Sequence, residues 1–223
     1  VLEVLEQERV PIDAIAGTSM GAIVGGLYAS GMSAGEIEHA LTSIDWGDAF
    51  RDRPPRRELT FRRKLDDSNF LVRFPLGIRG GKFRLPRGFI QGQKLTRMLR
   101  EFTAPVVLVT DFDRLPIPFR AVATDLETGA ARVFCSGDLV TAMRASMSAP
   151  GVFVPVEIDG RLFVDGGLAD SLPVDVMRQM NVDVLIVVDV SSALLAKQDL
   201  ESALSVSNQA LAILVRKETD RQK

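Results

Sequence analysis

Cysteine is almost absent from this 223-residue chain, in which Cys135 stands alone. A single thiol excludes a disulfide within the chain and any metal site built from several cysteines. Histidine is equally scarce, with His39 as its one representative. No apolar run approaches the roughly 18 residues that a membrane-crossing helix needs. The composition therefore favours a soluble or peripheral protein that needs neither a disulfide framework nor a cysteine-bound metal.

Strong net charge is also lacking, because 27 Lys and Arg face 29 Asp and Glu, for a formal charge of −2. This balance disfavours a nucleic-acid partner. The charges are unevenly spread, since residues 50–90 hold 12 basic and 4 acidic side chains and the rest of the chain holds 15 and 25. We predict a single domain over residues 1–223 that carries a basic insertion of short strands or loops at 50–90.

Apolar patterns alternate between strand and helix along the chain, which predicts an α/β fold with a central, mostly parallel sheet flanked by helices. The run at 184–188 is typical of a strand buried on both faces. The amphipathic terminal segment, residues 199–223, either covers the sheet or forms a homodimer surface over residues 204–215. The other expected strands are 12–16, 119–124 and 161–164, and the other expected helices are 22–30, 34–44, 93–102, 139–146 and 174–180.

Residues 17–21, GTSMG, match the G-x-S-x-G pattern of a nucleophilic serine. A strand is expected directly before this pentapeptide and a helix directly after it, an arrangement that exposes Ser19 Oγ on a tight turn at the positive end of the helix. We expect Gly17 and Gly21 to remove Cβ atoms that would collide in this turn. The backbone N–H of Met20 is then a candidate oxyanion donor. The alternative is an ordinary glycine-rich turn with a capping serine.

A serine nucleophile needs a base, and His39 is badly placed to supply one. Helical spacing puts His39 on the polar side of its predicted helix, away from the apolar stripe. Asp165 is the better candidate, because it follows an expected strand and precedes Gly166 and Gly167, so that it shares the sheet edge with Ser19. Burial would raise its pKa toward a range useful for proton abstraction. The alternative is a simple Asp-Gly turn.

Three sequence blocks together resemble the patatin-like phospholipase family. They are residues 15–22 (IAGTSMGA), residues 144–155 with RASMSAP followed by FVP, and residues 162–167 (LFVDGG). The resemblance implies a three-layer α/β domain, Ser19 as nucleophile, Asp165 as general base and acid, and the hydrolysis of phospholipids or other acyl esters by a phospholipase A type of reaction. It also implies that neither a metal nor a soluble cofactor takes part.

Asp125 and the segment 113–119 resemble bacterial members of the family, including secreted passenger domains tethered to outer-membrane barrels. This would place the protein at the cell surface or outside the cell, with the cytoplasm as the alternative. The family's glycine-rich oxyanion loop precedes the helix that here opens at Val1. We therefore expect the chain to be incomplete at its N-terminus, with Met20 N–H as the evident remaining donor.

The basic insertion suggests peripheral contact with membranes. Arg62, Arg63 and Lys64, with Phe61 and Phe70 nearby, would bind anionic lipid headgroups, unless they form only a solvated loop. Two other functions stay open at this point. One is a non-catalytic lipid-binding or membrane-recruitment module, and the other is an acyltransferase or thioesterase that uses the same pair of residues.

Overall fold

The computed structural model describes residues 1–49, 77–79, 82–84, 90–191, 193–200 and 202–222. Its helices are α1 (Leu2–Gln7), α2 (Met20–Ala29), α3 (Ala34–Ser43), α4 (Trp46–Ala49), α6 (Gln93–Phe102), α7 (Leu139–Ser146), α8 (Val174–Arg178) and α9 (Ala203–Gln222). Its strands are β1 (Ile15–Thr18), β2 (Gly77–Arg79), β3 (Lys82–Arg84), β4 (Phe119–Asp125), β5 (Ala131–Phe134), β6 (Val156–Ile158) and β7 (Arg161–Asp165). Short 3-10 turns, among them η2 (Ala104–Val106) and η4 (Gly166–Leu168), connect them.

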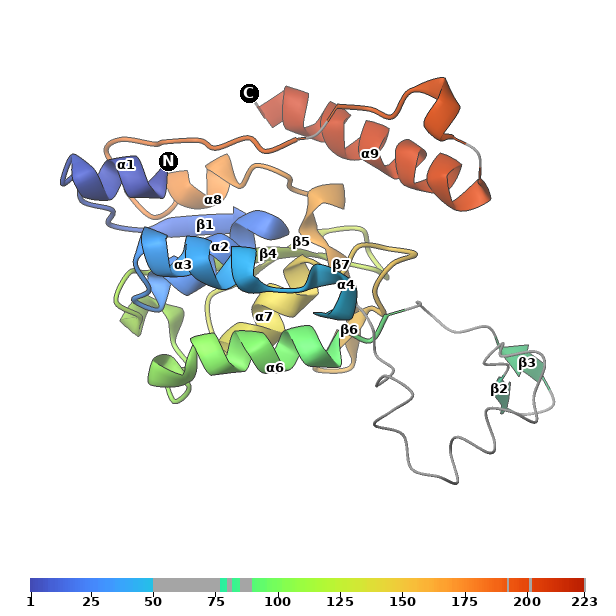
Figure 1. Cartoon of the computed structure of the whole chain (residues 1–223), viewed down its shortest axis with the longest axis horizontal. Coiled ribbons are helices and arrows are strands. Elements are labelled where there is room, and N and C mark those ends of the chain that lie inside the picture. Colours follow the sequence, from blue (N-terminus) through green and yellow to red (C-terminus); the bar gives the residue numbers. More distant parts are fainter. Residues whose placement is uncertain (50–76, 80–81, 85–89, 192, 201, 223) are drawn as a thin grey trace.

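The expected α/β class, with a central sheet flanked by helices, is confirmed. Figure 1 shows α6 and α7 on one side of the sheet and α8 and α9 on the other, which gives three layers. The sheet is mixed. Parallel pairing joins β1 to β4, whereas β5 and β7 pair antiparallel with β4, and β6 pairs antiparallel with β7.

Strands β1 and β7 lie end to end along one edge of β4. Residues 121 and 122 of β4 pair with both β1 and β5, and residues 123 and 124 pair with both β5 and β7. Since a strand has only two edges, β5 occupies one of them, and β1 and β7 share the other. β1 runs parallel to β4 and β7 runs antiparallel, so their carboxyl ends converge where Thr18 pairs with Val122 and Asp165 pairs with Ala123.

The core lies between the sheet and the helices α2 and α7. Phe119 of β4, Leu27 of α2 and Met143 of α7 are fully buried there. The two helices approach closely at Gly26, because a Cβ at that position would stand 2.5 Å from Met143 Sδ. This packing holds the amino end of α2 and the carboxyl end of α7 in a constant relation to the sheet.

The buried strand predicted at 184–188 is wrong. These residues form no strand and lie exposed, with Val184 79% and Val187 48% accessible. A buried strand needs a neighbour to pair with its backbone groups. Within the described residues no strand pairs with this run, and β1 pairs with β4 alone. Hydrophobicity indicates an apolar segment here but does not supply a neighbouring strand.

Several predicted bounds shift. The helix expected at 22–30 starts earlier, at Met20, and the terminal helix begins at Ala203. Ser33 and Glu36 form the expected capping box at the start of α3. The antiparallel hairpin β2–β3 is the described part of the segment 50–89, most of which lies outside the described residues. No helix that the structure describes combines the length and apolar character needed to span a bilayer.

The close approach of α2 and α7 predicts opposite effects of alanine at two helical glycines. Gly26→Ala should lower the free energy of unfolding by about 1–3 kcal/mol, because its Cβ forces Met143 to move within a packed core. Gly35→Ala in α3, where a Cβ would meet nothing within 4 Å, should raise it by about 0.5–1 kcal/mol. Urea unfolding of both variants checks this, and a Gly26→Ala protein as stable as the parent would contradict it.

Candidate active site

The serine at the end of β1 sits on a strained backbone. Ser19 has φ 56° and ψ −118°, in a region that costs a non-glycine residue roughly 1–3 kcal/mol, and α2 begins at the next residue. The turn is so tight that a Cβ at Gly17 would stand 2.3 Å from the carbonyl oxygen of Gly21. The steric reason expected for Gly21 itself is wrong, since a Cβ there would meet nothing within 4 Å.

The structure brings Ser19 and Asp165 into contact although 146 positions separate them. Ser19 Oγ donates a hydrogen bond of 2.6 Å to Asp165 Oδ2. The other carboxylate oxygen, Oδ1, accepts the Gly167 N–H at 2.8 Å. A Cβ at Gly166 would stand 2.2 Å from Val122 O, so only glycine lets the chain turn away from β7 at this point. The contact follows directly from the converging ends of β1 and β7.

Burial tunes the carboxyl group of this pair. Loss of hydration raises the pKa of Asp165 above its ordinary value, and the hydrogen bonds from Ser19 and Gly167 offset part of that rise. His39 lies exposed on α3, as its helical position predicted. Among the described residues, Asp165 is the titratable side chain that hydrogen-bonds Ser19 Oγ.

Three further hydroxyl groups hold the backbone around this pair. Ser146 Oγ, at the end of α7, accepts the Ser19 N–H at 2.9 Å and donates to Val122 O at 2.5 Å. Thr124 Oγ1 donates to Asp165 O, and Thr18 Oγ1 donates to Asp170 O. The sequence reasoning assigned no role to any of them. The only signal for Ser146 was its place in the block 144–150.

α2 begins directly after Ser19, and the first backbone N–H groups of a helix have no acceptor in a preceding turn. Ser146 takes the Ser19 N–H, and the Met20 N–H follows it at the first helical position. The positive end of the helix dipole lies here and favours negative charge. The role of Met20 N–H as an oxyanion donor stays a prediction.

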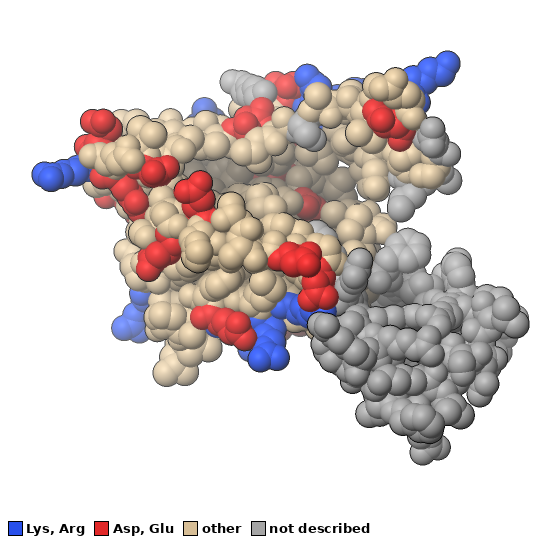
Figure 2. All heavy atoms as spheres, viewed as in Figure 1, with Lys and Arg blue, Asp and Glu red and all other residues tan. Residues whose placement is uncertain are grey.

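The carboxyl-terminal part of α9 packs against the loop that follows Asp165. Gln222 Nε2 donates to Asp170 Oδ1 at 2.9 Å, and Gln222 Oε1 accepts the Leu172 N–H at 2.8 Å. Figure 2 shows the surface hollowed between the α9 layer and the body that holds the sheet. Val206 and Leu214 of α9 are exposed. Whether residues 204–215 form a homodimer surface stays a prediction.

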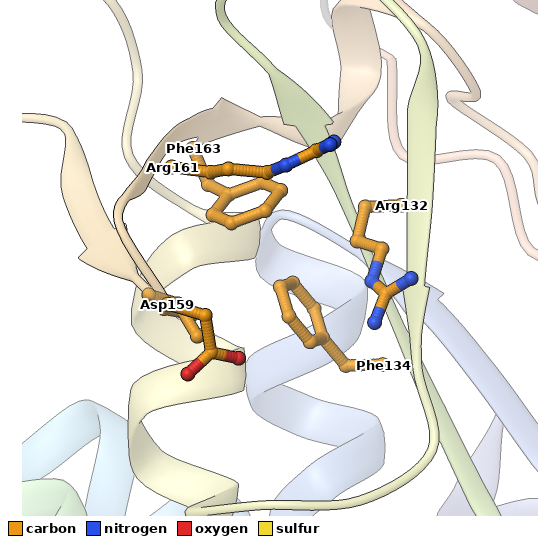
Figure 3. A pocket seen from close by; sticks show the side chains of 6 residues that line it. Arg132, Phe134, Asp159, Arg161 and Phe163 are labelled. Atoms are coloured by element: carbon orange, nitrogen blue, oxygen red, sulfur yellow. The ribbon is translucent and has the colours of Figure 1, made fainter.

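A separate cavity of about 240 Å³ opens at the far end of β7, away from Asp165. Figure 3 shows Phe134 and Phe163 among the side chains that line it, with Arg132 and Arg161 beside the two rings. Neither Ser19 nor Asp165 lines it. Within the described residues no group of three His, Cys, Asp or Glu side chains could hold a metal ion. Arg62, Arg63 and Lys64 lie outside the described residues.

The fold and the contact define a class, an α/β protein whose serine lies on a strand-to-helix elbow against an aspartate. The chain belongs to the patatin-like phospholipase family, whose model matches residues 1–178. The match covers both site residues and all three sequence blocks. Family membership agrees with the observed layers of sheet and helices.

Relatives of this chain occur in bacteria and animals. An uncharacterized NTE family protein of Mycobacterium tuberculosis is 34% identical over 193 residues, which is 86% of this chain and 45% of that protein. Patatin-like phospholipase domain-containing protein 6 of Homo sapiens is 29% identical over 195 residues, 86% of this chain and 12% of that protein. The chain thus spans less than half the length of these relatives. They do not support the expected passenger subgroup tethered to an outer-membrane barrel, since they carry NTE and patatin-domain names.

The elbow geometry predicts that its two glycines differ. Gly17→Ala should destabilise the protein by several kcal/mol or displace Ser19, because its Cβ would overlap a backbone carbonyl that cannot rotate away. Gly21→Ala should leave the free energy of unfolding unchanged or raise it by up to about 1 kcal/mol through helix propensity. Thermal and urea unfolding of the two variants measure this, and equal stabilities would contradict the geometry.

Proposed function

We propose that this chain is the catalytic domain of a serine acyl-ester hydrolase that acts on phospholipids or other acyl lipids. The single observation that carries the proposal is the 2.6 Å hydrogen bond from Ser19 Oγ to Asp165 Oδ2. Membership of the patatin-like phospholipase family supports lipid as the substrate class. Ser19 acts as the nucleophile, and Asp165 acts as the general base and then as the general acid.

In the first half-reaction, Ser19 Oγ forms a bond to the ester carbonyl carbon while its proton moves to Asp165 Oδ2. The carbonyl electron pair moves onto the oxygen, where the Met20 N–H and the amino end of α2 stabilise the negative charge. The tetrahedral species then loses the alcohol. The ester C–O bond breaks, Asp165 returns the proton to the departing oxygen, and the acyl group stays on Ser19.

In the second half-reaction, water takes the place of the alcohol. Asp165 accepts a proton from the water as its oxygen bonds to the acyl carbon, and the proton returns to Ser19 Oγ when the acid leaves. Asp165 serves both half-reactions because its carboxyl group contacts Ser19 Oγ, the oxygen that loses the proton in the first and regains it in the second. An ester suits a carboxyl catalyst, since an alkoxide leaving group needs less help from a proton than an amine does.

The raised pKa of Asp165 is the electrostatic feature that makes this carboxylate a useful base. A carboxylate with an ordinary pKa would hold a proton too weakly to take one from a serine hydroxyl. Burial of Asp165 disfavours its charged form and so strengthens the base. The Gly167 N–H, which donates to Oδ1, keeps Oδ2 directed at Ser19.

Two variants test the proposed pair. Ser19→Ala and Asp165→Asn should each lower ester hydrolysis and covalent labelling by a fluorophosphonate probe at least about 10³-fold, since both remove a reacting group. Asp170→Asn is the matched control, because Asp170 is also a partly buried carboxyl with a raised pKa but bonds Gln222 instead of a serine. Intact-protein mass spectrometry places the label, and a parent that folds without labelling at Ser19 would instead favour the lipid-binding module.

The raised pKa of Asp165 also predicts opposite effects of pH on rate and stability. Labelling of Ser19 should fall as the pH drops through that pKa, which burial raises above the ordinary aspartate value, because the base becomes protonated. A folded-state pKa above the unfolded one means that the charged carboxylate destabilises the fold, fully so above the folded pKa and not at all below the unfolded one. Asp165→Asn should therefore gain melting temperature over the parent as the pH rises through this window, and a difference independent of pH would contradict the assignment.

A further inference from the structure

We propose that Ser146 is a positioning residue for the nucleophile, whose hydroxyl holds the Ser19 backbone in the conformation that aims Oγ at Asp165. This inference rests on the proposed function for its catalytic consequence. The positioning itself is argued from hydrogen bonds between described residues. Ser146 is fully buried, so its hydroxyl reaches neither solvent nor substrate directly.

The hydroxyl completes a short chain of hydrogen bonds between two strands. The regular β1–β4 ladder ends where Thr18 pairs with Val122. One residue further along, the Ser19 N–H donates to Ser146 Oγ at 2.9 Å, and that hydroxyl donates to Val122 O at 2.5 Å. The donors and acceptors of these two hydrogen bonds are unambiguous, because a backbone amide N–H can only donate and a carbonyl oxygen can only accept. A side chain from α7 thus stands between the end of β1 and the neighbouring strand.

This insertion explains how the strained conformation of Ser19 persists. With φ at 56°, Ser19 is held in a region that a non-glycine residue leaves unless the surroundings constrain it. A partly buried amide without a partner would be costly and would favour rotation toward another acceptor. Ser146 supplies that acceptor at the position that the elbow requires, and the missing Cβ at Gly17 lets the turn close this tightly.

The hydroxyl is itself held by a rigid support. Ser146 is the last residue of α7, whose Ala142 and Ala145 are buried and whose Met143 packs against Gly26 of α2. α7 and α2 therefore share one packed contact, and α2 starts at the nucleophile elbow. Ser146 consequently sets the Ser19 amide from the same core that sets the helix amino end.

The hydrogen bond to Ser146 also gives the Ser19 N–H and the Met20 N–H different roles at the elbow. Because the Ser19 N–H is committed to Ser146, it does not serve the developing oxyanion. The next amide, that of Met20, is left for that task. A displacement of the Ser19 backbone by about 1 Å would disturb both the Oγ–Asp165 contact and the direction of this amide, and such shifts cost roughly 100-fold in rate.

Ser146→Ala tests the proposal against Ser30→Ala. Ser30 is a buried serine at the carboxyl end of α2 whose Oγ donates to Leu27 O, away from the site, so both variants lose a buried hydroxyl at a helix end. Ser146→Ala should lower the maximal rate of fluorophosphonate labelling at Ser19 by about 10–100-fold with the probe's half-saturating concentration within about twofold. Ser30→Ala should label at the parental rate even where its melting temperature falls as much.

A second measurement keeps the geometry testable without turnover. In Ser146→Ala the Ser19 amide loses its acceptor, so its hydrogen exchange, followed by NMR, should become faster relative to its neighbours in α2 and β1 than in the parent. If Ser146→Ala does not fold, Ser146→Cys keeps a weaker donor and acceptor, and it should label Ser19 more slowly than both the parent and Ser30→Ala.

The possible failures are distinguishable. A parent protein that never labels at Ser19 overturns the proposed hydrolase, and amide exchange then still decides whether Ser146 holds the elbow. A Ser146→Ala protein that labels at the rate of Ser30→Ala, or whose Ser19 amide exchanges as in the parent, overturns the positioning role. A Ser146→Ala protein that labels Ser19 slowly, together with slow hydrogen exchange of the Ser19 amide in the parent, supports it.

Discussion

The site depends on two strands that meet end to end along one edge of β4. β1 arrives from one direction and β7 from the other, and their last residues pair with neighbouring positions, Val122 and Ala123. Because alternate residues of a strand face opposite sides of the sheet, a shift of either register by one residue would turn the serine or the aspartate away. The hydrogen bond between Ser19 and Asp165 is thus a consequence of strand register as much as of side-chain chemistry.

Three features of this meeting point are costly or allow only one kind of residue. Ser19 adopts a left-handed backbone, Asp165 holds a carboxyl group where hydration is reduced, and Gly166 passes so close to β4 that a side chain would overlap it. Such strain persists only where the surroundings determine the conformation. Here the packed pair α2 and α7 provides that constraint, and Ser146 transmits it to the Ser19 amide.

Local patterns predicted the elements well and their partners less well. The capping box of α3 and the helix at 139–146 follow from signals within a few residues, and the strands expected at 12–16 and 161–164 appear at Ile15–Thr18 and Arg161–Asp165. The run 184–188 shows the limit, because hydrophobicity indicates that a strand would be buried but not that a partner strand lies beside it. Gly21 is a second example. The motif predicted a glycine there for steric reasons, but a Cβ at Gly21 would meet nothing within 4 Å.

The sequence alone determined which groups are available for chemistry: a serine in an elbow motif, an aspartate followed by two glycines, and a histidine on the wrong helix face. Their types and spacings are local properties, so they can be read from the chain. Only the tertiary structure decided that Ser19 Oγ bonds Asp165, that burial raises the pKa of the aspartate, and that the Ser146 hydroxyl accepts the Ser19 N–H. Local patterns indicated only that both residues lie at one sheet edge, because the contacts themselves depend on pairing and packing between residues more than 100 positions apart.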